Sequence, residues 1–246
     1  MEWGGIFKIL GKVFLGTIVL VVIYVVTLCY PQPFFKNKVT VGDVTVYSDR
    51  DIPTEEITNI VNETQSRVAK SVLYKPGMKQ NVFISNDLWR WWYFSSIHHK
   101  ASGINQILFN HNIFFRKTDI KNNRLYGQSG NVAPGDRTLD YFLAHEMTHA
   151  LEFQSMPWYK YPLQTNWVLE GYCEYIAHGS RSYETALNQY LNVPENSGEK
   201  YYTRARTMVA YLLEKEKIEI SKIWSKADDY DLVLKMAIPD DKPIYN

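Results

Sequence analysis

The chain has 246 residues and almost balanced charge, with 27 Lys and Arg against 26 Asp and Glu. No block of like charge stands out that would follow a phosphate backbone, which argues against a nucleic-acid partner. A hydrophobic content of 46% excludes a disordered or fibrous chain, and the two cysteines cannot form a disulfide framework.

The N-terminal region is apolar. The 18 residues from Val13 to Tyr30 carry no charge and, as a helix, would extend about 27 Å, close to the hydrocarbon thickness of a bilayer. The stretch is longer than a usual signal-peptide core and lacks a small-residue cleavage pattern, so we expect an uncleaved anchor, with a cleaved signal as the alternative. Lysines flank it on both sides and specify orientation only weakly. We expect a single pass through the cell membrane, with the N-terminus inside and the domain extracytoplasmic.

The sequence predicts an anchor and linker over residues 1–35 and one domain over residues 36–246. Within that domain, residues 39–47 alternate as one or two strands about a turn at Gly42. Pro53 opens an amphipathic helix that should end before Pro76. The apolar stripe of this helix consists of Ile57, Ile60, Val61, Val68 and Val72.

Three further segments precede the motif helix. Residues 81–85 predict a strand, and residues 103–115 predict an antiparallel pair of strands. The segment Asp87–Ser96 is crowded with aromatic side chains that could line a substrate groove or touch lipid, although packing in the core is the favoured interpretation. Residues 127–135 have the composition of a loop.

The last part of the chain is helical. Asp136 or Thr138 can cap a helix that ends at Pro157, and two more helices are expected over residues 166–178 and 197–217. Strands mixed with helices, followed by helices alone, predict an α+β fold. We expect an α/β lobe over residues 36–135 with antiparallel strands, a mainly helical lobe over residues 136–246, and a zinc site in the cleft between them.

Residues 145–149 read HEMTH, the HExxH pattern. Positions four apart on a helix differ by about 40° in direction, so His145 and His149 can both bind one zinc ion. Glu146 lies beside them, where its carboxylate can take a proton from a metal-bound water. The metzincin pattern would require glycine and histidine at the positions of Glu152 and Ser155, which excludes that branch.

A catalytic zinc site needs a third protein ligand. Glu170 follows His149 by 21 residues, enough for the chain to turn and return on a second helix. Glu174 and His178 share one face with Glu170 and remain alternative ligands. Cys173 is interpreted as a small apolar packing residue.

Residues 139–175 resemble the gluzincins, the thermolysin-like clan of zinc peptidases, and particularly their small membrane-associated bacterial members of the peptidase MA-like type. The resemblance implies one Zn²⁺ per chain bound by His145, His149 and Glu170. It also implies a catalytic base at Glu146 and, at Glu174, a carboxylate that supports a ligand histidine. The stretch from Gly103 to Asn110 is similar to the family's substrate-facing edge strand.

The resemblance further implies an oxyanion donor in the later helical lobe, for which Tyr201, Tyr202, Tyr172 and Arg204 are candidates. The expected function is a membrane-anchored zinc metallopeptidase that hydrolyses a peptide or protein substrate by a glutamate-activated, zinc-bound water. Two alternatives stay open. One is a catalytically silent, membrane-tethered protein that binds zinc or a substrate, and the other is a zinc hydrolase of non-peptide substrates.

Overall fold

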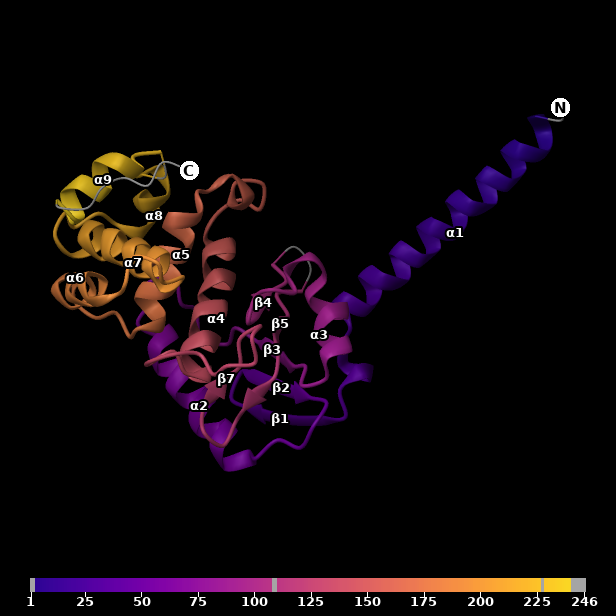
Figure 1. The fold of residues 1–246 in the computed structure, drawn as a ribbon, viewed down its shortest axis with the longest axis horizontal. Helices are drawn as coiled ribbons and strands as arrows, with labels where there is room; N and C mark the ends of the chain where they lie inside the picture. Colours follow the sequence, from indigo (N-terminus) through magenta and orange to yellow (C-terminus); the bar gives the residue numbers. More distant parts are fainter. Residues whose placement is uncertain (1–2, 108–109, 227, 240–246) are drawn as a thin grey trace.

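The computed structural model describes residues 3–107, 110–226 and 228–239 of an α+β chain. A long N-terminal helix, α1 (Trp3–Cys29), projects from a body that has a sheet near the base of this helix and a group of helices at the far end (Figure 1). The expected α+β class is therefore confirmed.

The central sheet has five strands in the order β1-β2-β3-β5-β4. Antiparallel pairs lie at both ends, as expected: β1 with β2 about Gly42, and β4 with β5. The two middle pairs are parallel, which corrects the prediction of an antiparallel lobe. A helix connects β2 to β3, and such a crossover returns the chain in the same direction. The strands are β1 (Asn37–Val41), β2 (Val44–Ser48), β3 (Gln80–Ile84), β4 (Gly103–Asn105) and β5 (Ile113–Phe115), and a separate pair is formed by β6 (Thr118–Asp119) and β7 (Arg124–Leu125).

The crossover helix α2 (Thr54–Val68) is shorter than predicted. The residues of the predicted apolar stripe that lie within the helix are buried as expected. Val72, the last residue of the stripe, lies beyond the helix and is 79% exposed. The hydroxyl of Ser71 accepts a hydrogen bond from the backbone N–H of Leu73 at 3.1 Å. This local side-chain bond gives the backbone an alternative to the next helical turn, so the helix ends well before Pro76.

The two faces of the sheet carry different cores. Val82 and Ile84 of β3 pack in a cluster with α2 and with the motif helix α4 (Leu139–Ser155). Phe83, between them, points to the other face and stacks on Phe114 at 5.0 Å between ring centroids. Strand periodicity of two produces this division.

The aromatic segment forms helix α3 (Leu88–Ser95), which was not predicted as a helix. Trp91 and Phe94 are buried in the core of the second sheet face, so packing in the core is confirmed for this side of the helix. Trp89 and Trp92 are each 55% exposed, so the same helix also presents aromatic surface.

The helical part has its own core. The predicted helices over residues 166–178 and 197–217 are present as α5 and α7, whereas α6, α8 and α9 were not predicted. A Cβ at Gly171 would lie 2.5 Å from the carbonyl oxygen of Ala205, which shows how closely α5 approaches α7. Because the motif helix α4 contacts both α2 and α5, it lies between the core on the α2 side of the sheet and the core of the helical part. These helices are α5 (Asn166–Ala177), α6 (Tyr183–Asn192), α7 (Glu199–Glu214), α8 (Ile220–Ile223) and α9 (Tyr230–Ala237).

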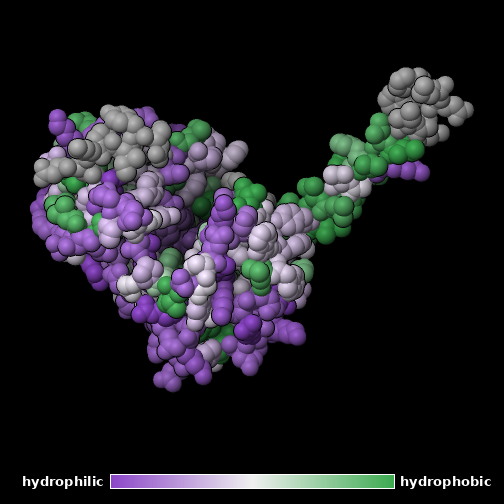
Figure 2. Space-filling model, in the orientation of Figure 1, coloured by the Kyte–Doolittle hydropathy of each residue, from purple (hydrophilic) through white to green (hydrophobic). Residues whose placement is uncertain are grey.

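The segment Ile9–Cys29 of α1 has 21 residues with a mean hydropathy of 2.6, long and apolar enough to span a membrane, a property that a signal sequence shares. Its exposed surface is hydrophobic along most of the helix, whereas the body is largely hydrophilic (Figure 2). Its last turn is part of the body. Leu28 is 5% exposed in the aromatic core, and Asn112 donates hydrogen bonds to the carbonyls of Leu28 and Cys29 at 3.1 and 3.2 Å.

Candidate metal centre

Helix α4 presents the two motif histidines side by side, and the neighbouring helix α5 brings a glutamate to them. Nε2 of His145 lies 3.2 Å from one carboxylate oxygen of Glu170, and Nε2 of His149 lies 3.7 Å from the other. Two ligand atoms that are each about 2.1 Å from a tetrahedral ion are separated by about 3.4 Å. The spacing of these three side chains therefore fits a shared metal ion.

The third charged motif residue, Glu146, faces a cavity of about 430 Å³ that is also lined by both histidines and Glu170. Its backbone carbonyl accepts a hydrogen bond from the Asn105 side chain of β4 at 2.7 Å. Burial raises the pKa of Glu146. A carboxylate of this kind, next to the metal ligands, is suited to accept a proton.

Strand β4 passes directly over this carboxylate. A Cβ at Gly103 would lie 2.4 Å from the ring of Phe115 and 3.2 Å from Oε1 of Glu146. Glycine is therefore the residue that permits the edge of the sheet to approach the candidate base so closely.

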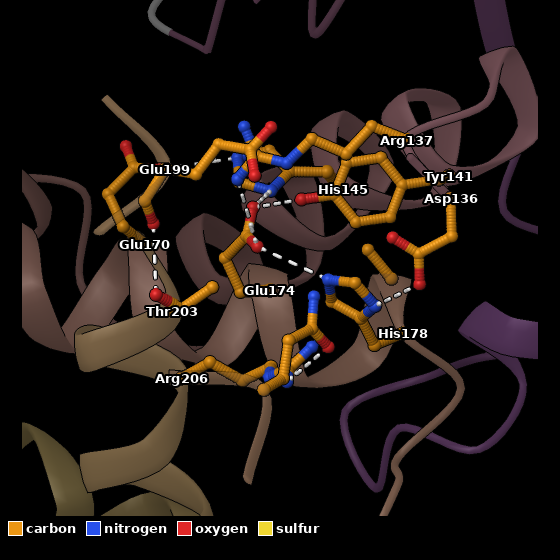
Figure 3. Close-up of polar contacts among 12 residues, drawn as sticks. Asp136, Arg137, Tyr141, His145, Glu170, Glu174, His178, Glu199, Thr203 and Arg206 are labelled. Atoms are coloured by element: carbon orange, nitrogen blue, oxygen red, sulfur yellow. Dashed lines mark hydrogen bonds and ion pairs between the residues drawn. The ribbon is translucent and has the colours of Figure 1, made fainter. Parts of the chain in front are cut away.

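The second nitrogen of His145 contacts a buried carboxylate. Nδ1 lies 3.1 Å from Oε1 of Glu174, and this oxygen also accepts a hydrogen bond from the hydroxyl of Tyr141. Arg137 and His178 each lie 3.6 Å from the other oxygen. Figure 3 shows these side chains converging on the Glu174 carboxylate. Burial alone would raise the pKa of Glu174, but hydrogen bonds to His145 and His178 and the charge of Arg137 hold it well below its usual range.

These contacts distinguish the three candidates for the third metal ligand, which are Glu170, Glu174 and His178. Glu174 contacts the Nδ1 nitrogen of His145, on the other side of the ring from Glu170. His178 contacts Glu174 and, at 3.5 Å, Asp136. Of the three residues, Glu170 is the one that contacts the Nε2 atoms of both motif histidines.

Nδ1 of His149 lies among three polar groups that sequence analysis did not connect with it. Oε2 of Glu152 is 3.1 Å away, the hydroxyl of Tyr161 is 3.1 Å away and Sγ of Cys173 is 3.2 Å away. Burial raises the pKa of Glu152 to about 7. Cys173 is thus more than an apolar packing residue, and it forms with His145 and His149 a buried cluster whose ligand atoms lie within 4.8 Å of one another. That cluster could also bind a metal ion.

The three tyrosines proposed as oxyanion donors occupy different places. Tyr202 lines the cavity that contains Glu146, and its ring centroid lies 6.5 Å from that of His145. Burial raises the pKa of Tyr202 to about 12. Tyr201 lines a separate cavity, and the hydroxyl of Tyr172 forms a hydrogen bond of 2.7 Å with Ser71. The structure therefore brings Tyr202 to the candidate centre.

Four residues around the centre were missed as site residues at the level of sequence. Glu152 follows His149 by three positions on one helix, a spacing that could have suggested contact. Asn105 lies in the predicted edge strand. Arg137 lies in the loop before α4 and Tyr161 in a short 3-10 helix after it, and no local sequence pattern identifies either residue.

No protein-family model matches the sequence, and a comparison with curated proteins finds no match. Function is therefore inferred from the geometry of the site.

Proposed function

We propose that this protein is a membrane-anchored zinc metallopeptidase of the gluzincin type. One observation carries the proposal: Nε2 of His145 and Nε2 of His149 both face Glu170, while Glu146 lies free of that contact at the wall of an open cavity. Three ligands and a separate carboxylate are what a catalytic zinc site requires.

In this proposal His145, His149 and Glu170 hold the zinc ion. Zinc would supply an acidified water and polarise the scissile carbonyl. Glu146 accepts the proton and later delivers it to the leaving amine. The hydroxyl of Tyr202 donates a hydrogen bond to the carbonyl oxygen as negative charge develops there.

The edge of the sheet supports a polypeptide substrate. One backbone hydrogen bond lies on each side of β4. The carbonyl of Ser102, just before the strand, accepts from the β5 side, and the N–H of Gln106, just after the strand, donates to that side. By the alternation of an antiparallel ladder, the N–H and C=O groups of Gly103 and Asn105 point away from the sheet. An extended peptide can add to such an edge as a further strand, and this edge runs beside Glu146.

The residue pattern supports the gluzincin assignment. The spacing from HExxH to Glu170 resembles that clan, and the contact between Glu174 and His145 corresponds to the carboxylate that supports a ligand histidine in it. The position of β4 beside the candidate base corresponds to the family's substrate-facing strand.

The docking of α1 supports an anchor that is retained. Removal of residues up to Cys29 would expose the core around Leu28 and would take away the carbonyls to which Asn112 donates. We therefore propose a single membrane pass, with Lys8 and Lys12 on the cytoplasmic side and the domain outside. The mass of the intact mature protein tests this, because cleavage would remove α1.

The peptidase proposal is tested with Glu146→Gln in the full-length protein. We expect the variant to keep one zinc ion per chain and to lose at least about 100-fold in hydrolysis, measured as new N-termini in a mixed peptide library by mass spectrometry. Glu55→Gln, at an exposed position on α2, is the matched control and should cleave like the parent protein. Equal cleavage by the Glu146→Gln variant would contradict the mechanism.

A structural zinc site is the competing interpretation, and chelation distinguishes it. A structural ion holds the fold, so its removal unfolds the protein. We expect chelation to abolish hydrolysis while the circular dichroism spectrum is retained, because the three hydrophobic cores include none of the proposed ligands. Unfolding on chelation would favour the structural role.

A further inference from the structure

A second cavity, of about 640 Å³, lies between α1 and the candidate metal centre. Its walls come from the last turns of α1, from α3 and the turn after it, from β4 and the residues that follow, and from the α4–α5 connection. We call it the membrane-side cavity. The residues used below are Tyr24, Val25, Leu28, Ile97, Ile104 and Tyr161.

The membrane-side cavity adjoins the cavity that contains Glu146. The two share wall residues of β4 and of the α4–α5 connection, among them Ile104, Asn105 and Tyr161. Asn105 donates its side-chain hydrogen bond to the backbone of Glu146, and the Tyr161 hydroxyl contacts His149. An extended chain lying along β4 can therefore occupy both cavities at once.

The other end of the membrane-side cavity opens beside the membrane-spanning segment. Tyr24, Val25 and Leu28 lie in the last two turns of the apolar stretch, where it would leave the bilayer. The helix is held there by the hydrogen bond from Tyr24 to the backbone of Tyr93 at 2.9 Å. Ile97, which lines the mouth, is 81% exposed.

Exposed tryptophans lie on two of the segments that form the walls of this cavity. Trp89 and Trp92 of α3 are each 55% exposed, and Trp158 in the α4–α5 connection is 68% exposed. Tryptophan concentrates at the level of lipid headgroups because its ring is apolar and its N–H is polar. Two segments that form the walls of the membrane-side cavity therefore carry the residue type that is typical of a membrane surface.

We propose that the membrane-side cavity binds an apolar stretch of the substrate polypeptide where that stretch leaves the bilayer, so that the substrates are membrane-anchored polypeptides cleaved close to the membrane. This inference rests on the proposed peptidase function and names its substrate class. A polypeptide is favoured over a lipid acyl chain because one wall is the edge strand β4, whose outward peptide groups at Gly103 match an extended backbone.

The binding test is independent of turnover. The full-length Glu146→Gln protein carries photoreactive benzoylphenylalanine in place of Ile97 and is reconstituted in phosphatidylcholine vesicles. The probe is a peptide library with a randomised segment attached to a leucine-alanine span of roughly 20 residues. The same randomised segment without the span is the comparison. We expect about tenfold more cross-linking to the anchored peptides than to the unanchored peptides. Burial of one or two large apolar side chains accounts for a difference of this size.

Two matched substitutions on α1 localise the effect. Val25→Trp fills the cavity, whereas Val26→Trp places the same side chain at a position that is 50% exposed. We expect Val25→Trp to lower cross-linking of the anchored peptide about tenfold and Val26→Trp to leave it unchanged. Both variants must keep the zinc content of the parent, which shows that they fold.

With Glu146 intact, the rate ratio of anchored to unanchored peptide should fall in Ile97→Asp. It should stay constant in Val72→Asp, a similarly exposed position in the turn after α2 that does not line the cavity. Cross-links to phosphatidylcholine alone, equal labelling of both peptides, or no effect of Val25→Trp would overturn the proposal. Cross-linking without any hydrolysis that depends on Glu146 would instead overturn the peptidase function and leave the binding site standing.

Discussion

Nδ1 of His145 lies 3.1 Å from the Glu174 carboxylate. The carboxylate is 1% exposed and faces Nδ1, the nitrogen that must carry the ring proton when Nε2 binds a metal ion. Glu174 is itself held by Tyr141 and Arg137, which makes the orientation of the ring a property of the buried network.

Glu174→Ala should therefore weaken zinc binding and hydrolysis together by about 10–100-fold, the usual cost of removing a carboxylate that orients a metal-bound histidine. Glu174→Gln should lose less, because the amide oxygen still accepts from Nδ1. Competition with a chelating dye measures the affinity. Glu219→Gln, at an exposed ion pair, is the control. Unchanged zinc affinity in Glu174→Ala would show that the network does not orient the ring.

The third ligand is decided by comparing Glu170→Gln with Cys173→Ser. We expect Glu170→Gln to lose zinc on dialysis, because its carboxylate faces both Nε2 atoms. Cys173→Ser should keep one zinc ion per chain. Cobalt substitution gives a second readout, since a thiolate ligand produces an intense near-ultraviolet charge-transfer band that carboxylate and imidazole do not. Such a band in the parent protein would assign Cys173 as the ligand.

The sequence predicted the parts of this molecule that depend on local periodicity. HExxH implies two histidines on one helical face, and the 21-residue interval to Glu170 implies a second helix, so the contact between them could be anticipated. The parallel pairing of β2 with β3 could not, because it depends on the path of α2 across the sheet. Tyr161 reaches the centre from a short 3-10 helix between α4 and α5, and Arg137 from the loop just before α4, and both positions are set by tertiary packing.

Glu152 should make zinc binding depend on pH. Burial raises its pKa to about 7, whereas Nδ1–H of a metal-bound His149 donates best to an ionised carboxylate. Zinc must therefore displace a proton, so the contribution of Glu152 to the apparent affinity should rise with pH up to about 7 and then level off. The metal-free protein should lose stability over the same range, because an acid with a folded pKa above its unfolded value of 4.5 opposes folding as pH rises through that window.

Glu152→Gln removes this titration. The zinc affinity of the variant should change less with pH between about 5 and 7, and its metal-free form should not lose the same increment of stability. Calorimetric titrations in buffers of different ionisation enthalpy count the protons released. Equal proton release from parent and variant would assign the proton to another group.

Gly103→Ala tests the close passage of β4 over the candidate base. The added methyl group would overlap the Phe115 ring at 2.4 Å and press on Glu146, so the strand must move. We expect a loss of about 1–3 kcal/mol in unfolding free energy, the usual cost of overpacking, with a larger loss in hydrolysis than in zinc content. Gly127→Ala is the control, because its nearest contact would be an ordinary 3.6 Å. Denaturant unfolding at constant zinc concentration measures the difference.

Asn112 tests whether α1 is a fixed part of the body. Its buried amide donates to the carbonyls of Leu28 and Cys29, the last residues of the helix, which have no partner further along it. Asn112→Ala removes the side-chain donor to the carbonyl of Leu28, whereas the carbonyl of Cys29 still accepts from Asn110 at 2.7 Å, and we expect the loss of about 1–3 kcal/mol that accompanies one unsatisfied buried group. Limited trypsin digestion of vesicle-bound protein should then cut faster at Lys36 and Lys38, just beyond the anchor, while Asn62→Ala on the exposed face of α2 digests like the parent. Equal digestion rates would mean that α1 is a flexible tether, and the mouth of the membrane-side cavity would then have no fixed height above the bilayer.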